Sequence, residues 1–141
     1  MTLVIDASVA LKWLVEEHGS DQAEQLVERQ EPLIAPDLVI TEVCNALCTK
    51  LRRWQITESQ AQRCARLLPD YFAEIVPCAG IASRAVAIAT SLAHPAYDCF
   101  YLALAEARQA RMVTADARLP ARIAGTGWES RAVPLVGAGP P

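Results

Sequence analysis

Short apolar runs rich in β-branched residues alternate with helical patterns along the chain, and this alternation constrains the fold more than any other feature. The first run, Leu3–Ile5, ends at Asp6, where a helix-start signal follows at once. Similar runs lie at residues 32–36, 73–77, 111–114 and 132–136. Strands that alternate with helices form βαβ units, so we predict an α/β fold. A mostly parallel sheet of about four or five strands should lie between two layers of helices.

The helical patterns between these runs have recognisable starts and stops. They cover approximately residues 9–15, 20–30, 38–54, 57–68, 80–92, 99–110 and 116–123. Asp98 is expected to open the sixth of these helices, after a break at His94 and Pro95. Pro134 cannot donate a hydrogen bond to a neighbouring strand, which predicts an edge position for the last strand.

A chain of 141 residues, 52% of them apolar, is long enough to bury one core. This composition excludes a disordered chain, a fibrous repeat and a disulfide-stapled miniprotein. We predict a single domain over residues 1–136 and a flexible C-terminal tail over residues 137–141. Because no basic and apolar leader precedes Asp6 and the five cysteines form an odd set, we expect free thiols and a cytoplasmic protein without a membrane span.

The net charge of −3 argues at first sight against a nucleic-acid partner. The charge is unevenly distributed, however. Residues 1–48 hold nine acids and two bases, or −7, whereas residues 49–141 hold seven acids and eleven bases, or +4. Net charge is therefore a poor guide to the partner of this chain.

Four carboxylates occupy places where strands end or helices begin. Asp6 follows the first predicted strand, and Asp116 lies two residues beyond Thr114, at the end of a later strand. Open α/β sheets bind ligands at the carboxyl ends of their strands. Asp98 opens a predicted helix, and Glu42 could join the others only if its polar helix stripe lines a cleft. The alternative is that the three aspartates cap helices and Glu42 is solvated.

Convergence of these four acids would be costly without a counter-charge. Two like charges about 4 Å apart repel by about 4 kcal/mol at an effective dielectric near 20. A divalent cation would relieve that repulsion, and oxygen ligands suit Mg²⁺ or Mn²⁺ better than Zn²⁺. Such a metal can lower the pKa of a bound water and stabilise the charge of a phosphodiester under attack. The spacing alone leaves this hypothesis and helix capping both open.

Four segments in order resemble the signatures of PIN-domain nucleases. They are Val4–Ser8, Thr41–Asn45, Tyr97–Ala105 and Val113–Asp116. Each is weak alone, but all four in this order and at this chain length are specific, and the overall pattern is similar to VapC toxins of bacterial toxin–antitoxin pairs. The resemblance runs from Leu3 to about Val136. It implies a PIN-like three-layer α/β/α sandwich.

The resemblance also implies which residues form the site. The family's four acids, expected both to bind metal and to act in catalysis, match Asp6, Glu42, Asp98 and Asp116. We call these the acidic quartet. Asp6 and Asp98 are the strongest metal-ligand candidates, and Asp116 would act directly or through water.

Polar side chains beside the quartet match the family's supporting positions, where oxygens orient carboxylates and water. These are Ser8, Asn45 and Thr114. One departure is Pro120, which we expect to shorten the helix after Asp116.

Basic residues that follow the acidic motifs could hold RNA, although each could equally be a solubilising charge. They are Lys12, Arg52, Arg53, Arg118 and Arg122. Arginines outnumber lysines eleven to two, which favours planar, bidentate contacts with phosphate.

The resemblance implies a metal-dependent endoribonuclease that is the toxin of a toxin–antitoxin pair. It would cleave RNA with water activated by Mg²⁺ or Mn²⁺. A VapB-like antitoxin would occupy the site, and the chain would form a homodimer, with Leu11, Trp13 and Leu14 as contact residues if they are exposed.

Two other functions remain possible from the residues. A haloacid-dehalogenase-type phosphatase also has an Asp after its first strand, but it has a second Asp where this chain has Ser8. A catalytically inactive PIN-like binding module has no need of four convergent acids.

Overall fold

The computed structural model describes residues 1–135, and its centre is one parallel sheet of five strands. The strands are β1 (Leu3–Ile5), β2 (Leu33–Pro36), β3 (Glu74–Val76), β4 (Arg111–Thr114) and β5 (Ala132–Pro134). They lie in the order β3-β2-β1-β4-β5. Residue 136 and the tail predicted at 137–141 lie outside the described residues.

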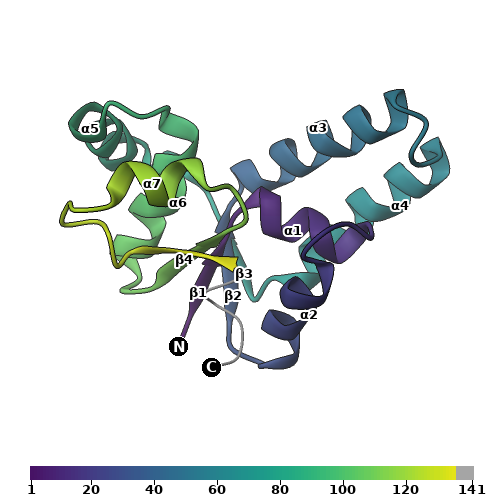
Figure 1. Ribbon diagram of the computed structural model, residues 1–141, viewed down its shortest axis with the longest axis horizontal. Coiled ribbons are helices and arrows are strands. Elements are labelled where there is room, and N and C mark those ends of the chain that lie inside the picture. The colour runs from purple at the N-terminus through teal and green to yellow at the C-terminus, as the bar shows by residue number, and fades with distance from the viewer. Residues whose placement is uncertain (136–141) are drawn as a thin grey trace.

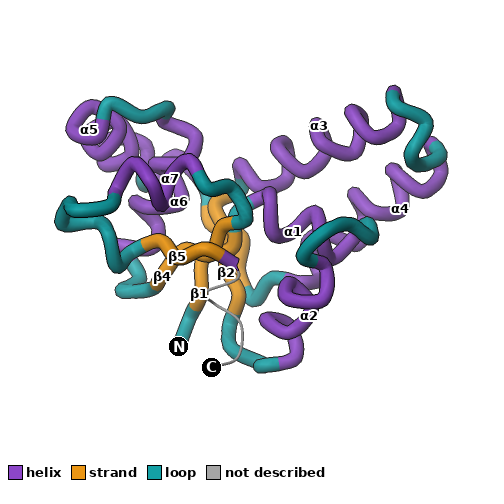
Figure 2. The backbone as a smooth tube through the Cα atoms, viewed as in Figure 1, coloured by secondary structure: helices purple, strands orange, loops and turns teal. Residues whose placement is uncertain are grey.

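Helices cover both faces of this sheet (Figure 1). The helices are α1 (Ala7–Leu14), α2 (Ser20–Glu28), α3 (Leu38–Arg52), α4 (Glu58–Leu67), α5 (Ala82–Leu92), α6 (Ala96–Ala107) and α7 (Arg118–Ile123), and two short 3-10 helices span Leu68–Tyr71 and Cys78–Gly80. Helices α1 to α4 lie on one side, and α5 to α7 on the other (Figure 2). The predicted three-layer α/β/α fold is confirmed, and all four strand pairings are parallel.

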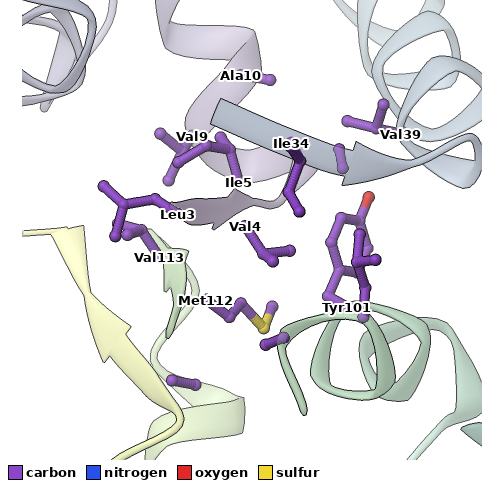
Figure 3. Packing of buried hydrophobic residues seen from close by; sticks show 14 of the residues in the cluster. Leu3, Val4, Ile5, Val9, Ala10, Ile34, Val39, Tyr101, Met112 and Val113 are labelled. Atoms are coloured by element: carbon purple, nitrogen blue, oxygen red, sulfur yellow. The ribbon is translucent and has the colours of Figure 1, made fainter. Parts of the chain in front are cut away.

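The core forms because the central strand is apolar on both faces. Figure 3 shows Val4 of β1 with Met112 and Tyr101 on the side of α6, while Ile5 lies with Val9 on the side of α1. These side chains are at most 1% exposed. Since alternate residues of a strand point to opposite faces, a central strand between two helical layers needs a continuous apolar run.

The order of the strands creates a switch point between β1 and β4. The chain moves from β1 outward to β2 and β3, then crosses to β4 and continues outward to β5. Ligands of open α/β sheets bind beside such a point, at the carboxyl ends of the strands. Asp6 follows β1 and Asp116 follows β4, so both acids lie at this edge. Pro134 lies in the edge strand β5, as predicted.

Two helix starts differ from the sequence prediction. Helix α6 begins at Ala96 after Pro95, so Asp98 lies in its first turn and does not cap it. Helix α7 begins at Arg118, two residues later than expected, and contains six residues. Pro120 falls in the first turn of α7, where backbone N–H groups have no partner inside the helix and proline is tolerated.

Candidate metal and nucleic-acid site

Asp6 is the most buried member of the acidic quartet, with 6% of its surface exposed. Its carboxylate caps α1 by accepting a hydrogen bond from the Val9 N–H at 3.2 Å. The Ser8 hydroxyl donates to Oδ1 at 2.6 Å, and the Thr114 hydroxyl donates to Oδ2 at 2.5 Å. These contacts join the ends of β1 and β4 and fix both carboxylate oxygens. Asp6 is therefore a helix cap and also a carboxylate aimed by its neighbours.

Burial raises the pKa of Asp6 from 3.8 to about 6. The three hydrogen bonds oppose this rise, and the negative charge of Asp98 adds to it. The ionised carboxylate is therefore held at a cost that a nearby cation would reduce.

Glu42 lines the site because α3 places it opposite α6. The Tyr101 hydroxyl donates to Glu42 Oε1 at 2.6 Å. Burial raises the pKa of Glu42, the Tyr101 hydrogen bond opposes this, and the charge of Asp98 adds to the rise. The Glu42 carboxylate is thus half-buried against Tyr101, whereas Asn45 on the same stripe of α3 is exposed.

Asp98 enters the site from the first turn of α6. Its Oδ2 lies 2.6 Å from Nε2 of His94, a side chain only 10% exposed. Its charge acts on both Asp6 and Glu42, raising the pKa of each after the larger effect of burial. Three members of the quartet therefore share one electrostatic environment.

Asp116 follows β4 and is held by Thr114 at the end of that strand and by Arg118 at the start of α7. Its N–H donates to the Thr114 hydroxyl at 3.1 Å, the same hydroxyl that donates to Asp6. Its carboxylate pairs with Arg118 at 2.5 Å. Arg118 is the main cause of the lowered pKa of Asp116, and His94 makes a smaller contribution.

The quartet fits a hard cation by its donor chemistry, although its side chains are not arranged around one. Among residues 1–135, no three His, Cys, Asp or Glu side chains are placed to hold a metal ion. All four acids offer oxygen, which suits Mg²⁺ or Mn²⁺. Metal binding by Asp116 would need its carboxylate to turn away from Arg118. The other carboxylates of the quartet already accept hydrogen bonds, but each still has lone pairs that a cation can use.

The supporting residues differ in how closely they approach the quartet. Ser8 and Thr114 contact Asp6 directly, as described above. Asn45 lies on α3 and is exposed, and within residues 1–135 no side-chain hydrogen bond links it to an acid of the quartet. Asn45 follows Glu42 by about one helical turn and lies on the same stripe of α3. Within the described chain, it is not part of the hydrogen bonds around the quartet.

The five predicted RNA-binding bases occupy different environments. Lys12 pairs with Glu17 at 3.0 Å, and Arg52 donates to Thr49 on its own helix. Arg52 is the last residue of α3 and Arg53 caps it, so both lie at the far end of the helix from Glu42. Of the five, within residues 1–135, only Arg118 pairs with an acid of the quartet.

Arg122 contacts the protein backbone. Its Nε donates to the carbonyl of Leu92, the last residue of α5, at 2.6 Å. This contact ties α7 to the end of α5.

Tyr101 and His94, the two donors that hold Glu42 and Asp98, are not among the site residues predicted from the sequence. Tyr101 follows Asp98 by three residues and therefore lies on the same face of the helix, and this spacing could have indicated that Tyr101 belongs to the site. His94 precedes α6, and in the sequence it marks only a break between two helices. The sequence has no local signal for its contact, because the contact depends on the turn between α5 and α6.

Comparison with known proteins identifies the family. The PIN domain family model matches residues 3–125, and the chain belongs to the PIN domain family. Ribonuclease VapC3 of Pyrobaculum aerophilum is 33% identical over 121 residues, covering 84% of this chain and 92% of the relative. Ribonuclease VapC9 of Mycobacterium tuberculosis is 34% identical over 117 residues, covering 83% and 87%.

Solved structures show the same fold. A crystal structure of a Pyrobaculum aerophilum protein matches with a TM-score of 0.74 at 20% identity, covering 98% of this chain and 86% of the other. A toxin–antitoxin complex from Klebsiella pneumoniae matches with a TM-score of 0.66 at 20% identity, covering 93% and 95%. The described helices include none long and apolar enough to cross a membrane.

Proposed function

We propose that this chain is a Mg²⁺- or Mn²⁺-dependent endoribonuclease and the toxin of a toxin–antitoxin pair. The observation that carries the proposal is the buried Asp6 carboxylate at the switch point of the sheet. The charge of Asp98 is close enough to raise the pKa of both Asp6 and Glu42. The family membership and the relatives named VapC ribonuclease support RNA as the substrate.

Asp6 and Asp98 are the first ligands in this proposal, with Glu42 and Asp116 bound directly or through water. When bound, the cation would lower the pKa of a water molecule and stabilise the charge on the phosphodiester. Ser8 and Thr114 fix the Asp6 oxygens before substrate arrives.

Arg118 is the base best placed to meet the substrate. Its side chain is 84% exposed while it pairs with Asp116. A phosphodiester could replace the Asp116 carboxylate as the partner of this guanidinium, which would free Asp116 to approach the cation. Lys12, Arg52 and Arg53 remain candidates for contacts farther along an RNA.

A VapB-like antitoxin, a homodimer and a cytoplasmic location belong to the same proposal. One of the expected dimer contacts is wrong. Trp13 is buried, stacks on Tyr71 at a centroid distance of 4.9 Å and donates to the carbonyl of Ala23. Leu11 and Leu14 are only half-buried and stay possible contact residues.

The direct test is RNA cleavage by the purified chain with Mg²⁺, with Mn²⁺ and with a chelator. We expect cleavage by the wild type only with metal, and a loss of at least about 100-fold in Asp6→Asn, because that change removes the best-placed ligand. Glu129→Gln, an exposed change in a loop, is the matched control and should cleave like the wild type.

Equal cleavage by the wild type and Asp6→Asn would contradict the proposal, as would metal-independent cleavage. A folded protein that cleaves no RNA offered would favour the inactive binding module. The phosphatase alternative does not suit a chain of the PIN family.

A further inference from the structure

His94 contacts an acid of the quartet from outside the sequence motifs. Its Nε2 lies 2.6 Å from Asp98 Oδ2, and its side chain is only 10% exposed. An ionised carboxylate can only accept hydrogen bonds, so Nε2 carries the proton that is donated to Asp98. Among the described residues, Asp98 Oδ1 has no hydrogen-bond donor and is left available for another partner.

The turn between α5 and α6 places this imidazole. Helix α5 ends at Leu92, and the residue that follows it, Ala93, has a left-handed φ of 49°. The His94 N–H then donates to the Ala89 carbonyl at 3.1 Å, which closes the turn. Pro95 follows as the N-cap of α6 and has a restricted φ. The His94 backbone is therefore fixed on both sides.

Arg122 holds the same turn from α7. Its guanidinium donates to the Leu92 carbonyl at 2.6 Å and to the Ala93 carbonyl at 3.5 Å. A left-handed alanine costs about 1–2 kcal/mol, so such a turn needs support from its surroundings. Contacts thus run from α7 through Arg122 to the end of α5, and from His94 to the Asp98 carboxylate.

We propose that His94 is a positioning residue that orients Asp98 toward a bound divalent cation, and that Arg122 secures the turn that carries His94. The inference deepens the proposed function and rests on it. Carboxylates that bind metals are commonly held by hydrogen bonds from neighbouring groups, and loss of such a partner costs about 10- to 100-fold in metal affinity or activity. Because His94 Nε2 donates to Oδ2 of Asp98, Oδ1 of Asp98 remains available to the cation.

The test measures the affinity of the purified full chain for Mn²⁺ in the absence of RNA. The electron paramagnetic resonance signal of free Mn²⁺ reports how much of the ion remains unbound. His94→Phe keeps a ring but removes the donor, and it should weaken binding about tenfold or more. His94→Gln puts an amide N–H near the position of Nε2, and it should bind within about threefold of the wild type. His18→Phe changes the other histidine, which is exposed, and should have no effect.

A double-mutant cycle separates positioning from general damage to the fold. In an Asp98→Asn background, His94→Phe should lower Mn²⁺ affinity by less than about twofold, because the oriented ligand is already gone. The same loss in both backgrounds would overturn the inference, as would wild-type affinity in His94→Phe. A wild type that binds no Mn²⁺ would instead overturn the proposed function itself.

Arg122→Met tests the second half of the inference. The change keeps a long apolar side chain but removes both donors to the end of α5. We expect a fall in Mn²⁺ affinity of about threefold to tenfold in the absence of RNA. If Mn²⁺ affinity is unchanged and only RNA binding weakens, Arg122 contacts phosphate and does not secure the turn.

Discussion

The Asp6 carboxylate is buried and ionisable at the same time. Two hydroxyls and one backbone N–H stabilise its charged form, but burial outweighs them and raises its pKa. The folded protein therefore binds a proton at Asp6 more readily than the unfolded chain does. This predicts a pH-dependent contribution to the stability of the metal-free protein.

Between about pH 4 and pH 6, the folded state holds a proton on Asp6 that the unfolded chain releases. Asp6 therefore makes the protein less stable as pH rises through this window, and the loss is complete above a pKa of about 6. The shift corresponds to about 3 kcal/mol. Asp6→Asn lacks this effect, so the stability of the wild type relative to Asp6→Asn should fall between pH 4 and pH 7.

Urea unfolding with a chelator present measures this difference. Comparing the two proteins at each pH cancels the titration of acids that do not interact with Asp6, such as Glu17 and Asp37, whose lowered pKa values act in the opposite direction. If the difference in the free energy of unfolding between the wild type and Asp6→Asn stays constant from pH 4 to pH 7, the pKa of Asp6 is not raised in the folded protein.

At the residue scale, the motifs predict some contacts of the site, such as those of Ser8 and Thr114, and miss others, such as that of Tyr101. Ser8 contacts Asp6 from the first turn of α1 and Thr114 contacts it from the end of β4, and the motifs contain both. His94 and Arg122 form contacts across a turn and between helices, which depend on the packing of α5 against α6 and α7. Spacing along the chain carries no information about such contacts.

Among the helices, α6 contributes most to the site. It presents Asp98 in its first turn and Tyr101 one turn later, and it packs across β1, β2 and β4. A carboxylate in the first turn interacts favourably with the helix dipole by about 0.3–1 kcal/mol. The like charges of Asp6 and Glu42 oppose this, so the two effects on the stability of the metal-free fold largely cancel.

Asp98→Asn should therefore change the melting temperature of the metal-free protein very little, or raise it slightly. The amide oxygen can still accept from His94. Thr57→Ala provides the comparison, because Thr57 caps α4 with a complete capping box, and its loss should cost about 1 kcal/mol. If Asp98→Asn lowers the melting temperature as much as Thr57→Ala does, Asp98 stabilises the start of its helix and is a structural residue, which is the alternative that the sequence left open.

Most helices and strands could be predicted, because their apolar patterns reflect which face is buried. The prediction placed α6 three residues late, since Asp98 looked like a cap while Pro95 takes that position. Local preference alone does not choose between two adjacent start signals. The choice here places Asp98 inside the helix, where it can meet Asp6 and Glu42.

For the whole molecule, the distribution of charge is more informative than its sum. The acids of the first 48 residues include Asp6 and Glu42, whereas the basic excess lies in the later residues. The strand order then brings Asp6 from β1 and Asp116 from β4 to one edge of the sheet. Acids distant in the sequence thus lie at one edge of the sheet, where the side chain of Arg118 is exposed.

The most direct test of a divalent-cation site is a crystal structure of the wild type grown with Mn²⁺, using anomalous diffraction to locate the ion. We predict an anomalous peak at the carboxyl ends of β1 and β4, bound by oxygens of Asp6 and Asp98 at about 2.0–2.3 Å, and no peak there in Asp6→Asn. A well-ordered protein with no peak at this edge under saturating Mn²⁺, or with its peak at another site, would contradict the account.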